Sequence, residues 1–312
     1  MNCYPVVIPT LCRYEYFRRC LLSLERNTLA KKTVVYIILD YPLKEEHWEG
    51  YNKIKEFLEK KFDFKKLIII KREKNFGAYI NHESALKDLF KTHNAIIVSE
   101  DDNEFSPNFL EYMNTCLEKY ENDYSVIAIG GHSLPAKWKT DGNNTIRCKR
   151  YCSAWGIGFW KSRENWLSNV NTVQLWNKIK PIKNAIKFFF ENPHRRFYEL
   201  MRFIHKREEL KYDSGYSTYM SLFDKYMIYP IISKVRNYGC DGSGQHPIRN
   251  TEKEYIDVES RFKIKGNDSV LMRENDIMLR KFFAKKEYGY SKINLLKMIM
   301  KYFLIKIGFH KI

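Results

Sequence analysis

The stretch AIIVSEDDNEFSPNFLEYM spans residues 95–113 and joins an apolar run to an acidic triplet and a helical pattern. Its start, Ala95–Ser99, is mostly apolar and rich in β-branched residues, a composition typical of a buried strand. The acidic triplet Glu100-Asp101-Asp102 follows directly, and Asn108–Tyr120 then carries apolar residues at helical spacing. Because open α/β sheets bind ligands outside the carboxyl ends of their strands, this order predicts a polar site at the end of the strand.

Short apolar runs alternate with helical patterns on both sides of this stretch. The further predicted strands are Pro5–Pro9, Thr33–Leu39, Leu67–Ile70 and Ser125–Ile129, and the further predicted helices are Tyr14–Leu24, Lys44–Lys61 and Asn81–Leu89. Strands separated by helices predict an α/β fold, with a mostly parallel sheet covered by helices on both faces. Beyond them we expect loops over residues 138–166, basic aromatic helices over 170–211, then a helix, a short strand and a Gly-rich loop over 212–246, and an apolar helix punctuated by lysines over 292–312.

The composition restricts the kinds of partner. The 312 residues are 44% hydrophobic, enough for a packed core, and carry a formal charge of +17. Such an excess predicts an anionic partner, which nucleic acid, an anionic membrane surface or a phosphorylated small molecule could each provide. The seven cysteines lack CxxC spacing, as is typical of reduced thiols in a cytosolic protein. We expect no signal peptide and no membrane-spanning helix.

The acidic triplet has two interpretations when its spacing is taken alone. Hard divalent cations take carboxylate oxygens as ligands, so the triplet could hold a cation that neutralises a phosphorylated leaving group. Alternatively, the acids form a solvated turn, or are favoured by the dipole of the helix that follows.

The neighbours of the triplet carry a resemblance. The run Glu100, Asp101, Asp102, Glu104, Pro107, Phe109, Glu111 and Tyr112 resembles the strand-EDD-x-E-x-x-P-x-F-x-E-Y pattern of GT-A fold glycosyltransferases. The likeness is greatest to the N-acetylglucosaminyltransferase I type and looser to bacterial family 2 enzymes. Blocks that agree in order are PVVIPTLCRYEYFRRCLLSL (5–24), IILDYP (37–42), SAWGIGFWKSREN (153–165) and YPIISKVRNYGCDGSGQH (229–246). The resemblance covers roughly residues 4–247.

The resemblance implies a role for each matching residue. Asp102 would bind Mn2+ or Mg2+, with His246 beside the metal and the diphosphate, and Asp213 would be the catalytic base. The nucleotide sugar would contact Pro9, Thr10, Arg13, Asp40, Asn75, Gly77, Glu100, Asp101, Trp155 and Gly156. Tyr41 and Pro42 depart from the pattern, because many family 2 enzymes carry a second acid after the residue that matches Asp40.

Several of these residues have an ordinary structural interpretation as well. Asp213 precedes the apolar run Tyr216–Phe223 and could be a helix N-cap, and Asp40 could initiate a turn before Tyr-Pro. His246 could be a loop histidine packed on Pro247, and the glycines after Tyr238 could form only a turn.

The function implied is an inverting, metal-dependent transfer of a sugar from a nucleotide donor, with UDP expected, to a hydroxyl of a glycan or lipid-linked glycan in surface polysaccharide synthesis. We expect residues 1–130 to bind the nucleotide sugar, 131–250 to hold the acceptor and catalytic half with an insertion at about 170–211, and 251–312 to form a helical extension. With its lysines, that extension could associate with an anionic membrane surface, and the expected location is cytoplasmic, peripheral on the inner face of the cell membrane.

Two other functions stay open at this point. A metal-dependent phosphoryl or nucleotidyl transferase would also use carboxylates at strand ends, although such sites usually need a separate acid for a second metal. A basic nucleic-acid-binding protein would explain the charge, but no known DNA- or RNA-binding motif is present, so we do not expect nucleic acid as the partner.

Overall fold

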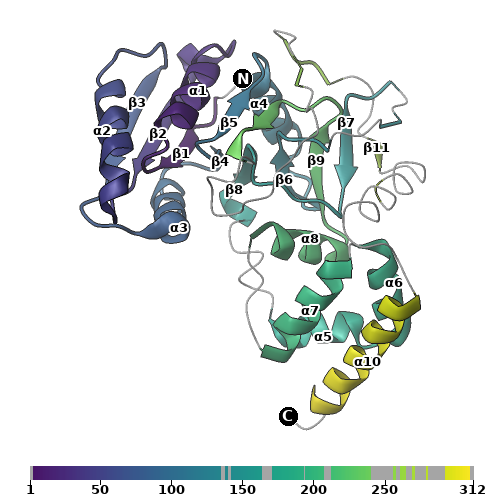
Figure 1. Ribbon diagram of the computed structural model, residues 1–312. Helices are drawn as coiled ribbons and strands as arrows, with labels where there is room; N and C mark the ends of the chain where they lie inside the picture. Colours follow the sequence, from purple (N-terminus) through teal and green to yellow (C-terminus); the bar gives the residue numbers. More distant parts are fainter. Residues whose placement is uncertain are drawn as a thin grey trace.

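The computed structural model describes residues 3–134, 138–139, 142–163, 171–192, 194–206, 212–239, 256–257, 261–264, 269–270, 279 and 292–309. Figure 1 shows a sheet with covering helices in the upper part and a group of helices below it. This lower group, here called the helical unit, consists of α5 (Thr172–Ile179), α6 (Ile182–Glu191), α7 (His194–Lys206), α8 (Tyr212–Phe223) and α10 (Lys292–Phe309).

The main sheet contains both parallel and antiparallel strands, and the predicted parallel strands are among them. Its strands are β1 (Val6–Thr10), β2 (Val34–Leu39), β3 (Lys66–Lys71), β4 (Ala95–Val98), β6 (Val126–Gly130), β7 (Thr145–Cys148), β8 (Ile157–Trp160), β9 (Tyr226–Pro230) and β11 (Ser269–Val270). Among the described residues their order is β11-β7-β9-β6-β8-β4-β1-β2-β3. β1 pairs in parallel with β2 and β4, whereas β8 runs antiparallel to both β4 and β6. Strand direction thus reverses next to β4, the strand that the acidic triplet follows.

Helices and short elements complete the upper part. The helices are α1 (Tyr14–Glu25), α2 (Trp48–Phe57), α3 (Gly77–Leu89) and α4 (Phe109–Lys119), with 3-10 turns η1 (Ala30–Lys32), η2 (Glu45–His47) and η3 (Lys161–Arg163). A separate antiparallel ribbon pairs β5 (Asn103–Phe105) with β10 (Val235–Asn237). This ribbon joins the residues after the acidic triplet to a segment far away in the sequence.

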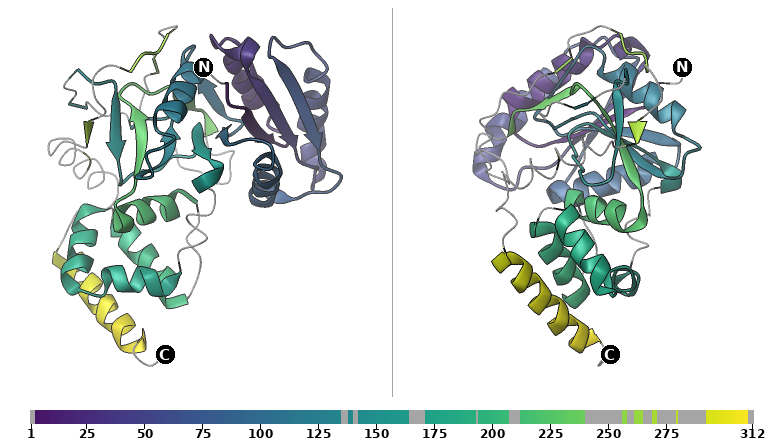
Figure 2. Two further views of the ribbon diagram at one scale, coloured as in Figure 1. Left: turned by 180° about the vertical axis from the view of Figure 1, so that it is seen from behind. Right: turned by 90° about the vertical axis from the view of Figure 1, so that its right-hand side faces the viewer.

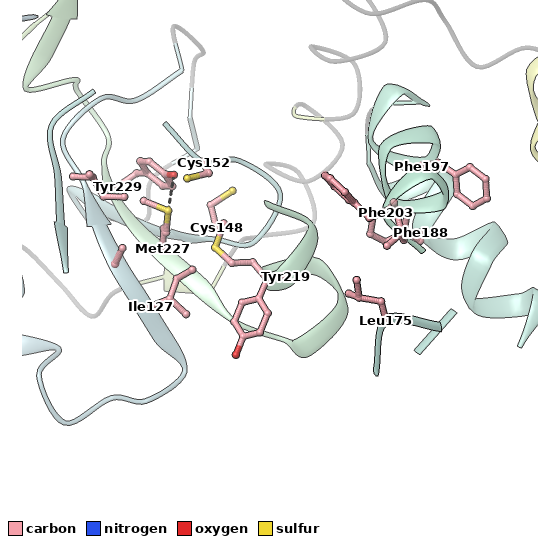
Figure 3. Packing of buried hydrophobic residues seen from close by; sticks show 14 of the residues in the cluster. Ile127, Cys148, Cys152, Leu175, Phe188, Phe197, Phe203, Tyr219, Met227 and Tyr229 are labelled. Atoms are coloured by element: carbon pink, nitrogen blue, oxygen red, sulfur yellow. Dashed lines mark hydrogen bonds between the residues drawn. The ribbon is translucent and has the colours of Figure 1, made fainter. Parts of the chain in front are cut away.

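Two hydrophobic clusters cover the two faces of the sheet. On β1, Val6 and Ile8 belong to the cluster beneath α1, α2 and α4, while Val7 points to the other cluster. This alternation follows from the two-residue period of a strand and explains why the strand is apolar throughout. The cluster that contains Val7 extends into the helical unit, and Figure 3 shows it running from Ile127, Met227 and Tyr229 of the strands to Phe188, Phe197 and Phe203 of the helices.

The predicted parallel sheet and the helical 170–211 segment are confirmed, with boundaries shifted by a few residues. The prediction of a loop over 138–166 is wrong, because β7 and β8 lie within it. β8 is only four residues long and contains Gly158, whose missing side chain leaves room for Met113 and Leu117. A strand this short carries too little periodicity to be found from sequence. The predicted helix over 44–61 is shorter, and α3 begins at Gly77 instead of Asn81.

The end of the chain contributes both strand and helix. β11 pairs in parallel with β7, so part of the expected C-terminal extension adds to the main sheet. The division into residues 1–130, 131–250 and 251–312 stays a prediction. Within the described ranges, no helix is both long enough and apolar enough to cross a membrane.

Candidate active site

The candidate site lies at the carboxyl ends of three neighbouring parallel strands. Thr10 ends β1, Asp40 follows β2, and Glu100-Asp101-Asp102 follows β4 after Ser99. β1 lies between β2 and β4 in the sheet, so these loops emerge side by side at one edge. From β1 the chain adds β2 and β3 on one side and β4 on the other, so the strand order reverses between β1 and β4, and such a switch point is where open α/β sheets bind their ligands.

A basic residue joins the first and third of these loops. Nη2 of Arg13, which precedes α1, donates to Asp101 and lies 2.7 Å from Oδ2 of Asp102. The hydroxyl of Thr10 donates to the second oxygen of Asp101 at 2.8 Å. Burial alone would lower the pKa of Arg13, but the two carboxylates outweigh it and raise that pKa above its ordinary value. Burial also raises the pKa of Asp101, and Arg13 opposes that shift.

Asp102 is held from the other side by the β5–β10 ribbon. The side-chain amide of Asn237 donates to Oδ1 of Asp102 at 2.6 Å, and the backbone N–H of Tyr238 donates to its carbonyl at 2.9 Å. Gly239 lies so close that a Cβ there would be 2.0 Å from Oδ2 of Asp102. Asn237 was not among the residues predicted from the sequence. Its position inside the block that ends at His246 was the only available signal.

Glu100 and Asp213 come together from distant parts of the chain. The side chain of Glu100 is reached by solvent although protein surrounds it on most sides. Burial, together with the negative charges of Asp102, Asp213 and Asp101, raises the pKa of Glu100 to about 8, and Arg13 opposes the shift. Asp213 is therefore close enough to the triplet to act on its ionisation. The four carboxylates form one negatively charged region, with Arg13 as a counter-charge.

Asp213 lies in the first turn of α8 rather than before it. The helix begins at Tyr212, so the carboxylate is favoured by the helix dipole but is not at the predicted N-cap position. Its Oδ1 lies 3.9 Å from the buried Sγ of Cys152, and its backbone carbonyl accepts from the hydroxyl of Ser217. The side chain is half-buried, which keeps it within reach of a ligand.

The predicted nucleotide loops are also brought together. Oδ1 of Asp40 accepts hydrogen bonds from the backbone N–H groups of Tyr41 and Phe76, both at 2.9 Å. The side-chain amide of Asn75 donates to the carbonyl of Tyr41 at 2.6 Å. Gly77 has a φ of +71°, a conformation that glycine adopts without strain. Asp40 thus ties the loop after β2 to the turn that precedes α3.

The remaining predicted residues are placed less directly. Pro9 lies on β1, and Trp155 packs edge-on against His132 at a ring-centroid distance of 4.6 Å. Gly156 has a φ of +68°, and a Cβ there would lie 2.9 Å from Val235 and 3.0 Å from Phe109. The packing of the chain therefore requires glycine at position 156, independently of any contact with a ligand. His246 lies outside the described residues.

The donor set fits a shared cation better than a resident one. Within the described ranges, no three Asp, Glu, His or Cys residues are grouped to hold a metal ion by themselves. Asp102 and Glu100 supply oxygen, the donor atom that Mg2+ and Mn2+ prefer, and Mg2+ commonly combines one or two carboxylates with phosphate oxygens of a substrate. The carboxylates fit a hard cation that arrives with a diphosphate.

Comparisons with known proteins were made against sequence families, curated sequences and solved structures. The sequence model of the family Glycosyl transferase family 2 matches residues 6–227, which is more than half of the chain. Among curated sequences, no significant match was found. The similar solved structures include S. aureus TarS 1-349, with 10% identity over 76% of this chain and 61% of that chain and a TM-score of 0.41.

Two further similar structures have bound ligands. A mannosyltransferase from Pyrobaculum calidifontis, in complex with GDP-Man and Mn2+, is 14% identical over 51% of this chain and 45% of that chain, with a TM-score of 0.36. GalNAc-T7 with UDP, GalNAc and Mn2+ is 11% identical over 76% of this chain and 44% of that chain, with a TM-score of 0.41. This chain spans less than two thirds of each of these three structures. On the family match over residues 6–227, the chain belongs to the glycosyltransferases of family 2 and has their α/β, GT-A type of sheet.

Proposed function

We propose that this chain transfers a sugar, with inversion, from a UDP-sugar to an acceptor hydroxyl, with the help of Mn2+ or Mg2+. The observation that carries the proposal is the pair Asp101 and Asp102, fixed by Arg13 at the carboxyl end of β4 and beside the Asp40 loop. Family membership favours sugar transfer over phosphoryl or nucleotidyl transfer and over nucleic-acid binding.

The donor would lie across the ends of β1, β2 and β4. Asp40, Asn75 and Gly77 belong to two loops that already contact each other, and with Pro9 they would receive the base and ribose. Glu100 would contact donor hydroxyls, and Asp101 would do so while Thr10 and Arg13 hold it in place. Trp155 and Gly156 would face the sugar or the acceptor. These roles rest on the position of each residue relative to the strand ends.

Two of the carboxylates would have different chemical roles. Asp213 would accept the proton of the acceptor hydroxyl as its oxygen forms a bond to the anomeric carbon. The bond from that carbon to the diphosphate breaks, and its electron pair leaves with the diphosphate. A divalent cation, held by Asp102 and joined by His246, would supply charge neutralisation for this leaving group. The electrostatic contact between Asp213 and Glu100 supports a base placed beside the donor.

We place the acceptor among glycans or lipid-linked glycans of surface polysaccharide synthesis, and the protein at the cytoplasmic side of the membrane. The helical unit supports this proposal because α8, which carries Asp213, belongs to it and packs against the basic helix α7. An acceptor that reached Asp213 would therefore pass close to this unit.

The test separates donor binding from transfer. We expect Asp213→Asn to bind a UDP-sugar with the same metal dependence as the unchanged protein, while transfer and slow donor hydrolysis fall about a thousandfold. Asp88→Asn, an exposed aspartate on α3, is the matched control and should keep both activities. Calorimetry would measure binding, and release of the corresponding nucleoside diphosphate across a panel of UDP-, GDP- and dTDP-sugars would measure turnover. Persistent turnover in Asp213→Asn would remove this residue from the chemistry.

A further inference from the structure

The C-terminal helix α10 is apolar on two opposite faces. Its sequence, KINLLKMIMKYFLIKIGF, contains lysine but no aspartate or glutamate. A helix that lies on a protein surface usually has one apolar face toward the core and one polar face toward water. The second apolar face of α10 therefore needs an explanation of its own.

The inner face of α10 packs on the other helices of the helical unit. Met298, Tyr302 and Ile305 are buried, and the ring of Tyr302 stacks on Trp176 of α5 at a centroid distance of 5.8 Å. The hydroxyl of Tyr198 on α7 donates to the backbone carbonyl of Asn294 at 3.4 Å. These contacts fix the rotation of α10 about its axis.

The outer face is exposed. Its large apolar side chains are between 46% and 68% exposed, and they are Ile293, Leu296, Met300, Phe303, Leu304 and Ile307. Their spacing follows the helical repeat, so they form one continuous stripe opposite the buried residues. Figures 1 and 2 both show α10 at the outer edge of the helical unit, on the side away from the main sheet. Contiguous apolar surface of this kind marks an interaction site.

Lysines border the stripe on both sides. At 3.6 residues per turn, Lys297 and Lys301 fall along one edge of the exposed stripe and Lys306 along the other; Lys297 is exposed, and the ammonium of Lys301 lies 5.3 Å from the ring centroid of Tyr198. The four helices α5, α6, α7 and α10 together carry eleven lysines and arginines but only two glutamates. We propose that the outer face of α10 binds an anionic lipid bilayer, with the apolar stripe inserted among the acyl chains and the lysines at the headgroups.

Charge selects the bilayer among the partners that could cover the stripe. A second copy of the chain, paired through the same face, would bring the lysines of two basic helices together, which is unfavourable. Nucleic acid would satisfy the lysines but leave the six apolar side chains in water. An anionic bilayer satisfies both groups at once. The inference goes beyond sugar transfer and does not depend on it, because donor binding can be measured without lipid.

The test is flotation of the full chain with vesicles. We expect it to bind vesicles of phosphatidylcholine and phosphatidylglycerol, to bind pure phosphatidylcholine weakly, and to lose affinity as NaCl is raised. Leu296→Glu combined with Leu304→Glu should reduce partitioning by about tenfold or more, because both side chains would carry charge into the apolar layer. Lys297→Gln with Lys301→Gln should reduce binding to anionic vesicles by roughly tenfold.

The control is Tyr124→Glu, which adds one negative charge, against two in the Leu296 and Leu304 variant, at a comparably exposed position before β6, at the opposite end of that strand from the site. It should bind vesicles like the unchanged protein, and all variants should show the same melting temperature and UDP-sugar affinity in lipid-free buffer. The proposal is overturned if the unchanged chain does not bind anionic vesicles, or if the Leu296 and Leu304 variant binds them equally well. It is also overturned if sedimentation shows a dimer that this variant dissociates, or if the variant loses affinity for nucleic acid instead of lipid.

Discussion

At the scale of single residues, Asp102 shows how a carboxylate is positioned by a distant segment. Arg13 and Asn237 contact different oxygens of Asp102, and the backbone of Gly239 packs against its side chain. Residues that orient a metal ligand commonly change metal affinity by ten- to a hundredfold when they are replaced. The absence of a side chain at Gly239 therefore helps to set the position of Asp102.

Gly239→Ala tests this packing. The added Cβ would lie 2.0 Å from Oδ2 of Asp102, so the carboxylate must move. We expect metal-dependent UDP-sugar affinity to fall about tenfold, as measured by calorimetry across Mn2+ concentrations. Gly308→Ala is the matched control, because a Cβ there has no atom within 4 Å. Equal affinities for the two variants would show that Asp102 does not need its observed position.

The residues of the site were predictable to different degrees. Asp40, Asp101 and Asp102 each follow a strand whose composition is clear in the sequence, so their common edge could be foreseen. Asn237 could not, because its contact with Asp102 depends on the pairing of β5 with β10, and three-residue strands leave no pattern. The electrostatic effect of Asp213 on Glu100 likewise depends on where the helical unit packs.

At the scale of elements, α5 begins with a complete capping box. Oδ1 of Asn171 accepts from the backbone N–H of Gln174 at 2.9 Å, and Oε1 of Gln174 accepts from the backbone N–H of Asn171 at 3.0 Å. Asn171→Ala should lower the free energy of unfolding by about 1 kcal/mol in urea titrations and leave UDP-sugar affinity unchanged. Asn52→Ala, an exposed site within α2, should cost nothing. A loss of donor binding in Asn171→Ala would show that the helical unit and the donor site are coupled.

Among the elements, β1, β2, β3, β4 and β6 were predictable, as was a short strand within residues 212–246, whereas β7 and β8 were not. β1, β2 and β4 are apolar runs buried on both faces, and this is a strong pattern. β7 and β8 are four residues each and lie in a segment rich in glycine and asparagine. They are strands because β9 and β4 present open edges to them, which is a tertiary effect.

At the scale of the whole molecule, charge is distributed unevenly between the strand ends and the helical unit. The carboxyl end of the parallel strands gathers carboxylates, although the chain as a whole carries a charge of +17. The helical unit gathers basic residues instead, and the cluster shown in Figure 3 packs it against the sheet. The +17 charge predicts an anionic partner. A diphosphate and an anionic bilayer are both partners of this kind, and the experiments above test each of them separately.

We propose that Asp102 binds a nucleotide sugar through a divalent cation. The most direct test is calorimetric titration of UDP-sugars into the protein with Mn2+ and with chelator, for the unchanged chain and for Asp102→Asn. We predict binding that requires Mn2+ in the unchanged chain, and at least about a hundredfold weaker binding in Asp102→Asn, since an amide replaces the charged ligand. Equal affinity with and without Mn2+, or full metal-dependent binding by Asp102→Asn, would show that Asp102 does not bind the nucleotide sugar through a divalent cation.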